Sequence, residues 1–340
     1  RKLRGKVQEW YDDPRLIFPA RLSAEQCSSS ATASYKTSLA AKIGRSLADL
    51  TGGLGVDTWF FSKKMEQVLY NEMQEKLCNA AAYNFKALDA VNICTRCGTA
   101  ETGNIGNILG DFHPDIIFMD PARRGEGGKK VFLIEECTPD VLSLKDEVFS
   151  FCRHMLLKLS PMADISMACE RLGRPCREVH VVAAGGECKE LLIWMDREWD
   201  DDYSVTAVEL PSSYPETPAA AFTFMPSDER TNVPDIAGPG DFIGHVPEDL
   251  YLFEPGKAMM KAGCFNLMGT RFGAGKLGRS THYYISSEKA RIQAMMNYGK
   301  AFRIIRIDPL DKKSVKTLGR DYPNADVSSR NIPMSSEMLA

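Results

Sequence analysis

The 340-residue sequence has no long apolar run, and no stretch approaches the roughly 18–20 consecutive apolar residues of a membrane-spanning helix. It also lacks the pattern of a secretory signal peptide. It begins with Arg1 rather than Met, so we expect it to be part of a longer chain. Together these absences predict a cytoplasmic protein that does not associate with membranes.

Paired cysteine motifs are also scarce, although the chain contains ten cysteines. Cys94 and Cys97 form a C-x-x-C, with neither a second pair nor a histidine nearby. A structural zinc site needs four ligands, so this spacing predicts no metal site. The other cysteines are scattered, and we expect reduced thiols throughout.

The chain has little net charge, −3 from 42 basic and 45 acidic residues, so its total does not indicate a nucleic-acid-binding protein. The charges are nevertheless segregated. Residues 203–254 carry one base, Arg230, against nine acids, and residues 255–330 carry fifteen bases against five acids. Such segregation predicts a basic region that contacts RNA phosphates. Docking of the basic region on the acidic segment is the alternative.

The chain is organised around a glycine turn. Residues 46–50 are a short apolar run, typical of a buried parallel strand. Gly52, Gly53 and Gly55 follow within four positions, and a helical pattern covers residues 56–64. A strand, a glycine turn and a helix N-terminus together predict a ligand site at the carboxyl edge of a sheet. A tight turn without a ligand is the alternative.

Two acids around this turn indicate which ligand it holds. Asp49 lies at the strand end and Asp57 at the helix start, with Thr51 between them. The Lys and Ser/Thr of a phosphate-binding loop are missing, and Asp57 would repel a dinucleotide pyrophosphate. Acids on both sides suit a cationic ligand without phosphate, such as S-adenosylmethionine. A nicotinamide oxidoreductase is therefore the weakest alternative.

Further acids follow at the ends of the next predicted strands. Glu72 lies 23 positions after Asp49, at the end of the strand predicted over 67–72. An acid at this position in doubly wound folds binds ribose hydroxyls, although it could also cap the following helix. The loop of residues 98–103, after the next predicted strand, contains one acid, Glu101.

The strand predicted over 115–119 is followed directly by Asp120, Pro121, Ala122, Arg123 and Arg124. We assign a catalytic role to Asp120, Pro121 and Arg123. Upstream, Ser28, Ser29, Ser30 and Lys36 lie close to the predicted ligand in the chain. We expect them to serve as helix caps and solvated surface rather than to border the cofactor.

Residues 49–57 resemble the first motif of class I S-adenosylmethionine-dependent methyltransferases. Many of these enzymes carry an acid near the loop after the third strand that contacts the adenine amine, so the resemblance implies this role for Glu101, with Asp111 as its competitor. Residues 120–123 correspond to the motif that faces the methyl group, which in amino-directed enzymes reads Asp/Asn-Pro-Pro-Tyr/Phe/Trp. This chain has Ala122 and Arg123 in place of the second proline and the aromatic residue. Asp-Pro-Ala-Arg looks more like the RNA uridine-C5 methyltransferases, but their Ser-Cys-Asn-Pro segment is absent. Cys188 is the only cysteine near a later strand end, in a different context.

The whole chain is similar to a bacterial group of class I methyltransferases with a THUMP-like C-terminal domain, on residues 25–29, 49–57, 120–124 and 187–190. The resemblance implies an α/β fold with a seven-stranded, mostly parallel, doubly wound sheet. It also implies an arm (1–29), a methyltransferase domain (30–200), a smaller α/β THUMP-like domain (203–340) and an RNA substrate. A cofactor-binding module without methyl transfer, and methylation of a small molecule or protein, are the alternatives.

Local patterns predict the remaining elements. In the first domain we expect helices over 31–43, 73–87 and 139–159, a strand over 91–94, and an antiparallel pair over 178–184 and 191–195. In the second we expect helices over 258–269, 287–298 and 314–318, the last capped by Ser314, and a strand over 302–307.

Overall fold

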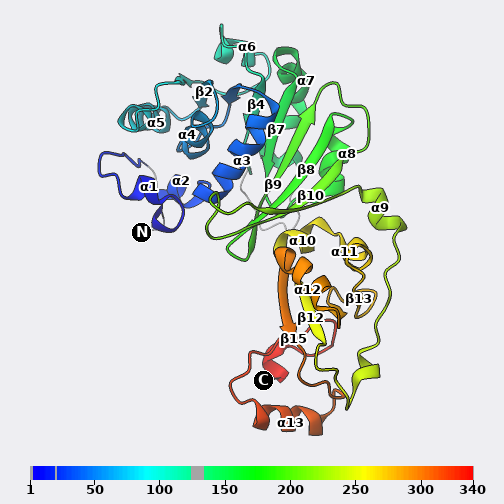
Figure 1. Ribbon diagram of the computed structural model, residues 1–340. Helices are drawn as coiled ribbons and strands as arrows, with labels where there is room; N and C mark the ends of the chain where they lie inside the picture. Colours follow the sequence, from blue (N-terminus) through cyan, green and yellow to red (C-terminus); the bar gives the residue numbers. More distant parts are fainter. Residues whose placement is uncertain (1–2, 20, 124–133, 340) are drawn as a thin grey trace. The chain divides into compact units, whose positions relative to one another are not determined.

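The computed structural model describes residues 3–19, 21–123 and 134–339. The chain divides into two compact units, residues 1–225 and 226–340, and each has its own β-sheet (Figure 1). The second unit begins later than the expected residue 203, because residues 204–210 and 220–224 are strands of the first unit's sheet. Within the described ranges, no helix is long and apolar enough to cross a membrane.

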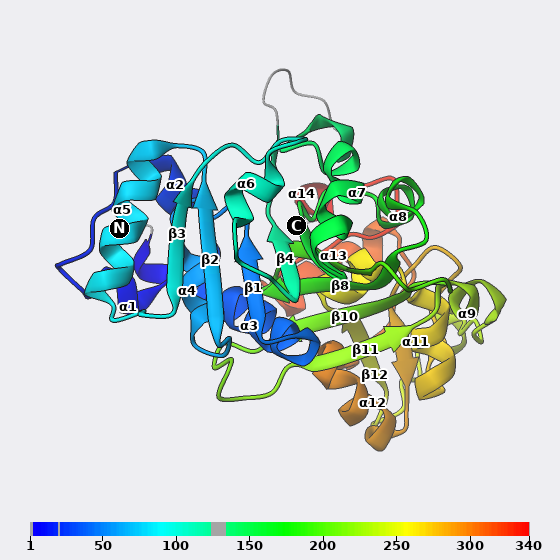
Figure 2. The same ribbon diagram turned by 90° about the horizontal axis from the view of Figure 1, so that it is seen from above.

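The first unit is built on a nine-stranded sheet in the order β11-β10-β8-β9-β7-β4-β1-β2-β3. Strands β3, β2, β1, β4 and β7 run parallel, β9 is antiparallel to β7 and β8, and β10 and β11 extend the sheet beyond β8. Figure 2 shows β3, β2 and β1 side by side. The predicted fold class is confirmed, with two more strands than expected. The bounds are β1 (Ser46–Asp49), β2 (Gln67–Glu72), β3 (Ile93–Cys97), β4 (Ile116–Met119), β7 (His154–Leu159), β8 (Cys176–Ala184), β9 (Glu187–Asp196), β10 (Ser204–Leu210) and β11 (Ala220–Phe224).

Helix α3 (Ser30–Ile43) precedes β1 and packs on the sheet. It starts with a capping box, in which the Ser29 hydroxyl accepts from the Thr32 N–H and the Thr32 hydroxyl accepts from the Ser29 N–H. Leu39 and Ala40 then contribute to the core over the central strands. The other elements of this unit are η1 (Leu3–Gly5), α1 (Gln8–Tyr11), α2 (Arg21–Gln26), α4 (Val56–Ser62), α5 (Glu75–Ala87), α6 (Ile105–Leu109), β5 (Ala122–Arg123), η2 (Ile134–Glu136), β6 (Cys137–Thr138), α7 (Val141–Phe151) and α8 (Ile165–Leu172).

The helix predicted over 139–159 is wrong in its second half, because α7 ends at Phe151 and β7 follows. Met155, Leu156 and Leu157 are fully buried between β4 and β9. A strand covered on both faces reads as a continuous apolar run, which cannot be distinguished locally from a buried helix. The antiparallel pair is confirmed as β8 and β9, and the third strand lies about two residues later than expected.

The second unit contains a four-stranded antiparallel sheet in the order β13-β14-β12-β15. The strand predicted over 302–307 is wrong in its position, since β15 spans Gly299–Arg303. Asp311, not Ser314, caps α13, because its carboxylate accepts from the Ser314 N–H at 2.8 Å. The bounds are α9 (Pro226–Thr231), η3 (Pro239–Phe242), β12 (Tyr251–Pro255), α10 (Lys257–Ala262), α11 (Phe265–Phe272), β13 (Gly275–Lys276), β14 (Tyr284–Ser286), α12 (Lys289–Met295), η4 (Met296–Tyr298), α13 (Lys312–Asp321) and α14 (Ser336–Leu339).

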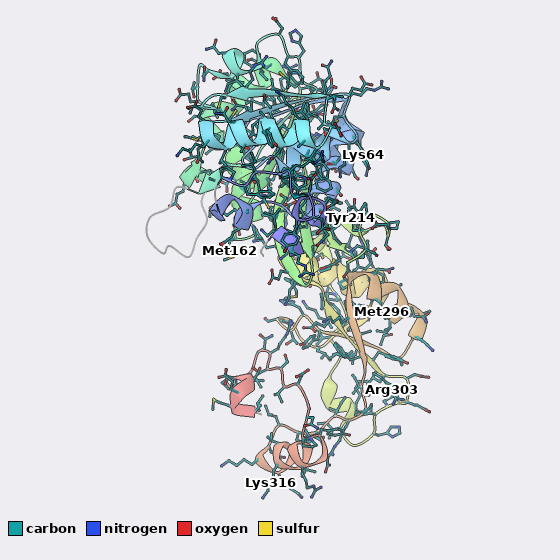
Figure 3. The ribbon with its side chains drawn as sticks, turned by 90° about the vertical axis from the view of Figure 1, so that its left-hand side faces the viewer. Lys64, Met162, Tyr214, Met296, Arg303 and Lys316 are labelled. Carbon is teal, nitrogen blue, oxygen red and sulfur yellow. The ribbon has the colours of Figure 1, made fainter. Side chains whose placement is uncertain are left out.

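Several arginines of this unit form ion pairs with acidic residues of the same unit. Arg306 contacts Asp308 at 2.7 Å and Asp321 at 3.1 Å. Arg330 contacts Glu254 of the acidic segment at 2.6 Å. Arg303 and Lys316, by contrast, extend outward in Figure 3.

Candidate active site

The turn between β1 and α4 is shaped by its three glycines. Gly53 and Gly55 have φ angles of 52° and 89°, in the left-handed region that glycine adopts without strain. A Cβ atom on Gly52 would lie 2.1 Å from the Tyr70 ring, and one on Gly55 would lie 2.7 Å from the Phe85 ring. A Cβ atom on Gly53 would meet no atom closer than 3.9 Å. Packing therefore requires Gly52 and Gly55, whereas Gly53 leaves the turn open to a ligand.

Asp49 ends β1 with only 1% of its surface exposed. Its Oδ1 accepts from the Thr51 N–H at 3.0 Å, and its Oδ2 accepts from the Thr58 hydroxyl at 2.7 Å. Burial raises the pKa of Asp49 to about 7, against the lowering effect of these two hydrogen bonds. A cation bound beside Asp49 would favour its ionised form.

Glu72 ends β2 beside the glycine turn, as its position in the sequence predicts. Its Oε2 accepts from the Gly53 N–H at 2.9 Å, and its Oε1 accepts from the Gln74 N–H at 2.8 Å. The Tyr70 hydroxyl fixes the same turn by donating to the Gly53 carbonyl at 2.6 Å. The carboxylate is thus held in one orientation, and each oxygen keeps a lone pair for a ligand hydroxyl.

Asp120 follows β4 and is tied to the glycine turn, because its N–H donates to the Thr51 hydroxyl oxygen at 2.6 Å. Its Oδ2 accepts from Lys158 Nζ of β7 at 2.5 Å. Burial alone would lower the pKa of Lys158, but the charges of Asp120 and Glu190 raise it above the usual range. Lys158 is therefore a charged group at the strand ends, and the Asp120 side chain remains 36% exposed.

The residues after Asp120 are placed only in part. Pro121 is buried, and the following two residues form β5, which pairs with β6 in an antiparallel ladder. The ladder fixes the backbone of Arg123. The side chain of Arg123 and the whole of Arg124 lie outside the described residues, so the catalytic role of Arg123 stays a prediction.

A buried ionic cluster lies beside the turn, formed by Ser28, Lys36, Asp57 and Glu190. Lys36 Nζ contacts Glu190 Oε2 at 2.9 Å and Asp57 Oδ1 at 3.2 Å, and its side chain is fully buried. It also donates to the Ser28 hydroxyl oxygen at 3.0 Å, and that hydroxyl donates to Asp57 Oδ2 at 2.8 Å. The solvated role expected for Lys36 is therefore wrong, and Asp57 is held by protein groups.

The glycine turn and the ends of β1, β2 and β4 surround a cleft of about 440 Å³, a size typical of small-molecule sites. Thr99 and Ala100 line it, but Glu101 and Asp111 are exposed and are not among its lining residues. The adenine contact by Glu101 thus remains a prediction without support from the cleft. The predicted site residues that line the cleft are Asp49, Thr51, Gly52, Gly53, Gly55, Asp57, Glu72 and Asp120.

Sequence reasoning did not assign Lys158, Lys36 or Glu190 to the site. Glu190 lies 154 positions from Lys36, and a pairing over this distance leaves no local pattern. Lys158 falls in the segment misassigned as helix, so its place at a strand end was hidden. The one available signal was that residues 187–190 and 25–29 carry the family resemblance.

Comparisons with known proteins identify the family. The crystal structure of a methyltransferase-like protein from Porphyromonas gingivalis W83 is 32% identical to this chain, with a TM-score of 0.84, and the match covers 99% of this chain and 80% of that one. The chain belongs to this methyltransferase family. It is an S-adenosylmethionine-dependent methyltransferase by homology. No curated protein matches the sequence.

The other comparisons concern parts of the chain. A ferredoxin-like domain family matches residues 251–291, within the second unit. This match is a coarser description than the THUMP-like domain that we predicted. An rRNA methylase from Streptococcus thermophilus is 10% identical over 48% of this chain and 94% of its own, with a TM-score of 0.35. M. capricolum TrmK, in complex with S-adenosylhomocysteine, is 12% identical over 49% and 70%, with a TM-score of 0.36. These two matches are too distant to indicate a substrate.

Proposed function

We propose that the enzyme transfers the methyl group of S-adenosylmethionine to a base in structured RNA, such as tRNA or rRNA. The observation that carries the proposal is the convergence of Asp49, Glu72 and Asp120 on one cleft, at three neighbouring strand ends. The segregated basic residues of the second unit support an RNA substrate.

The cleft fits the cofactor in size and in its polar groups. When bound, S-adenosylmethionine supplies an electrophilic methyl group on a sulfonium centre. The glycine turn would hold its methionine part, with Asp49 facing the cationic end. Glu72 would accept hydrogen bonds from both ribose hydroxyls, because its two oxygens are already oriented by backbone amides.

Asp120 and the Pro121 turn would place the acceptor. Methyl transfer is an in-line displacement, so alignment and exclusion of water are the main tasks of the protein. Asp120 would accept a hydrogen bond from the target amine or ring nitrogen, and its contact with Lys158, which orients the carboxylate, supports this role. A target base within structured RNA would have to leave its stack to reach this point.

The second unit would then position the RNA, as the THUMP-like resemblance implies. We propose a cytoplasmic setting, which is compatible with the ten cysteines, all in the described part of the chain, since no disulfide joins them. A cofactor-binding module without activity remains the second candidate, favoured by the departure of Ala122 and Arg123 from the amino-directed motif.

The decisive experiment is methyl incorporation from labelled S-adenosylmethionine into RNA from a strain that lacks the gene. We expect label in one RNA species, with the modified nucleoside identified by mass spectrometry, and no label in RNA from the parent strain. Incorporation into a protein or small-molecule fraction alone would contradict an RNA substrate. Cofactor binding without any incorporation would favour the inactive module.

A further inference from the structure

A second hollow, of about 840 Å³, lies in the first unit next to the cofactor cleft. Segments far apart in the sequence line it: the N-terminal arm, the start of α3, the loop after α4, the β8–β9 turn and the loop after β10. Gln26, Cys27, Ser28 and Lys158 line both hollows. The two spaces therefore border the same four residues, which include Lys158, the partner of Asp120.

Positive charge predominates around this hollow. Its lining contains three acids, and Glu190 among them is already paired with the buried Lys36. Glu9 accepts a hydrogen bond from the Ser30 hydroxyl, and Glu216 is exposed. Twice as many cationic residues line the same space: Arg4, Lys6, Lys63, Lys64, Lys158 and Lys189.

Lys64 and Lys189 are the cations best placed to receive an anion. Both are exposed, and among the described residues Lys64 Nζ donates to the Ser38 hydroxyl oxygen alone, at 3.0 Å. Lys189 pairs with Glu187 at 2.6 Å, but the Glu187 side chain is 73% exposed, so this pair contributes little. A phosphate could replace Ser38 as the partner of Lys64, or Glu187 as the partner of Lys189, at a small cost in free energy.

An aromatic side chain also lines the hollow. Tyr214 is half-buried in its lining, and its ring centroid lies 6.3 Å from that of Tyr35, which packs behind it. Figure 3 shows Tyr214 and Lys64 on the same unit. Cations that contact phosphates, beside aromatic rings that stack on bases, are the combination that binds single-stranded nucleic acid.

We infer that this hollow binds the acceptor strand, a single-stranded RNA segment next to the target base. Its phosphates contact Lys64 and Lys189, a flanking base stacks on Tyr214, and the target base passes Lys158 into the cofactor cleft. The inference rests on the proposed function. It adds that the first unit itself recognises the phosphates, apart from any contact by the second unit.

The test uses the double variant Lys64→Glu/Lys189→Glu of the full chain, saturated with S-adenosylhomocysteine. The probe is a fluorescent single-stranded RNA oligonucleotide, followed by anisotropy over a series of salt concentrations. We expect affinity to fall at least about tenfold and the salt slope to fall by about 1.4, about 0.7 for each phosphate contact on a single strand. The matched control is Lys76→Glu/Lys86→Glu, which changes the same net charge at exposed positions of α5 outside both hollows.

The outcomes separate this inference from the proposed function. RNA affinity equal in the variant and in the control would overturn the acceptor site, even if the enzyme methylates RNA. Competition by nucleoside monophosphates as strong as that by RNA would assign the hollow to a small phosphorylated acceptor and overturn the strand proposal. Tyr214→Ala should weaken binding of the RNA but not of an abasic oligonucleotide, and equal losses for both probes would contradict stacking. In all variants the affinity for S-adenosylhomocysteine should change less than about twofold, which shows that the fold is intact.

Discussion

Replacement of Glu72 by glutamine tests the cofactor site most directly, because the change keeps the shape of the side chain. The two carboxylate oxygens accept from the Gly53 and Gln74 amides, which leaves one lone pair on each for a ribose hydroxyl. Glutamine keeps one acceptor oxygen, but its NH2 group replaces the oxygen that would accept from the second ribose hydroxyl. One charged hydrogen bond to the ligand is therefore lost, at a cost of about 1.5–3 kcal/mol.

We expect this loss to weaken S-adenosylmethionine binding by about 10- to 150-fold, since 1.36 kcal/mol corresponds to a factor of ten. Isothermal titration calorimetry measures the change, with S-adenosylhomocysteine as a second ligand. Glu75→Gln is the matched control, because Glu75 is exposed in the first turn of α5, three residues away. One backbone amide also loses its acceptor in Glu72→Gln, so the melting temperature should fall by a few degrees.

An analogue of S-adenosylhomocysteine without the 2′-hydroxyl completes a double-mutant cycle. The wild-type protein should bind this analogue more weakly than the parent ligand, whereas Glu72→Gln should discriminate between them much less. If Glu72→Gln binds both ligands as tightly as the wild type does, the ribose contact lies elsewhere and the assignment of Glu72 is refuted.

Three further predictions concern charge and catalysis. The raised pKa of Asp49 means that its contribution to stability is present below about pH 4 and is lost as the pH rises through about 7. A cationic ligand favours the ionised carboxylate, so calorimetry should show that the affinity for S-adenosylmethionine rises up to about pH 7. The affinity for uncharged adenosine, and the affinity of Asp49→Asn for S-adenosylmethionine, should show no such rise. Asp120→Ala should lower turnover at least about a hundredfold in a radiolabel assay and retain cofactor binding; an active variant would leave Arg123 as the next candidate. Lys289→Glu/Arg303→Glu in the second unit should flatten the salt dependence of RNA affinity and preserve the melting temperature; a lowered melting temperature with unaltered RNA affinity would favour internal charge pairing.

The sequence predicts the glycine turn and the position of Glu72 beside it well, because both follow from local patterns. A strand, three glycines and a helix start fix the turn, and Glu72 follows at the spacing expected for the next strand end. The sequence pattern does not show why a glycine is needed at each of the three positions. Gly52 and Gly55 are required by the rings of Tyr70 and Phe85, which lie in other elements.

Asp120 also follows a strand that local sequence predicts, but its ion-pair partner Lys158 depends on long-range pairing and was not predictable. Lys158 lies on a strand whose continuous burial resembles a helix, and its partner Asp120 is 38 positions away. β10 and β11 lie beyond residue 200, where the sequence predicts the first domain to end, because the pairing of β10 with β8 and of β11 with β10 is a tertiary contact. Periodicity finds an element, but it does not find the partner of that element.

The burial of Lys36 between two carboxylates has a consequence for how the family can vary. Exchange of Lys36 for a neutral residue would remove the ammonium that contacts both Asp57 and Glu190, and breaking such a buried pair costs about 3–5 kcal/mol. Loss of one acid would remove one of the two attractions that hold the ammonium. Positions 36, 57 and 190 should therefore change together among homologues, as a set whose charges balance, even though they belong to three separate stretches of the chain.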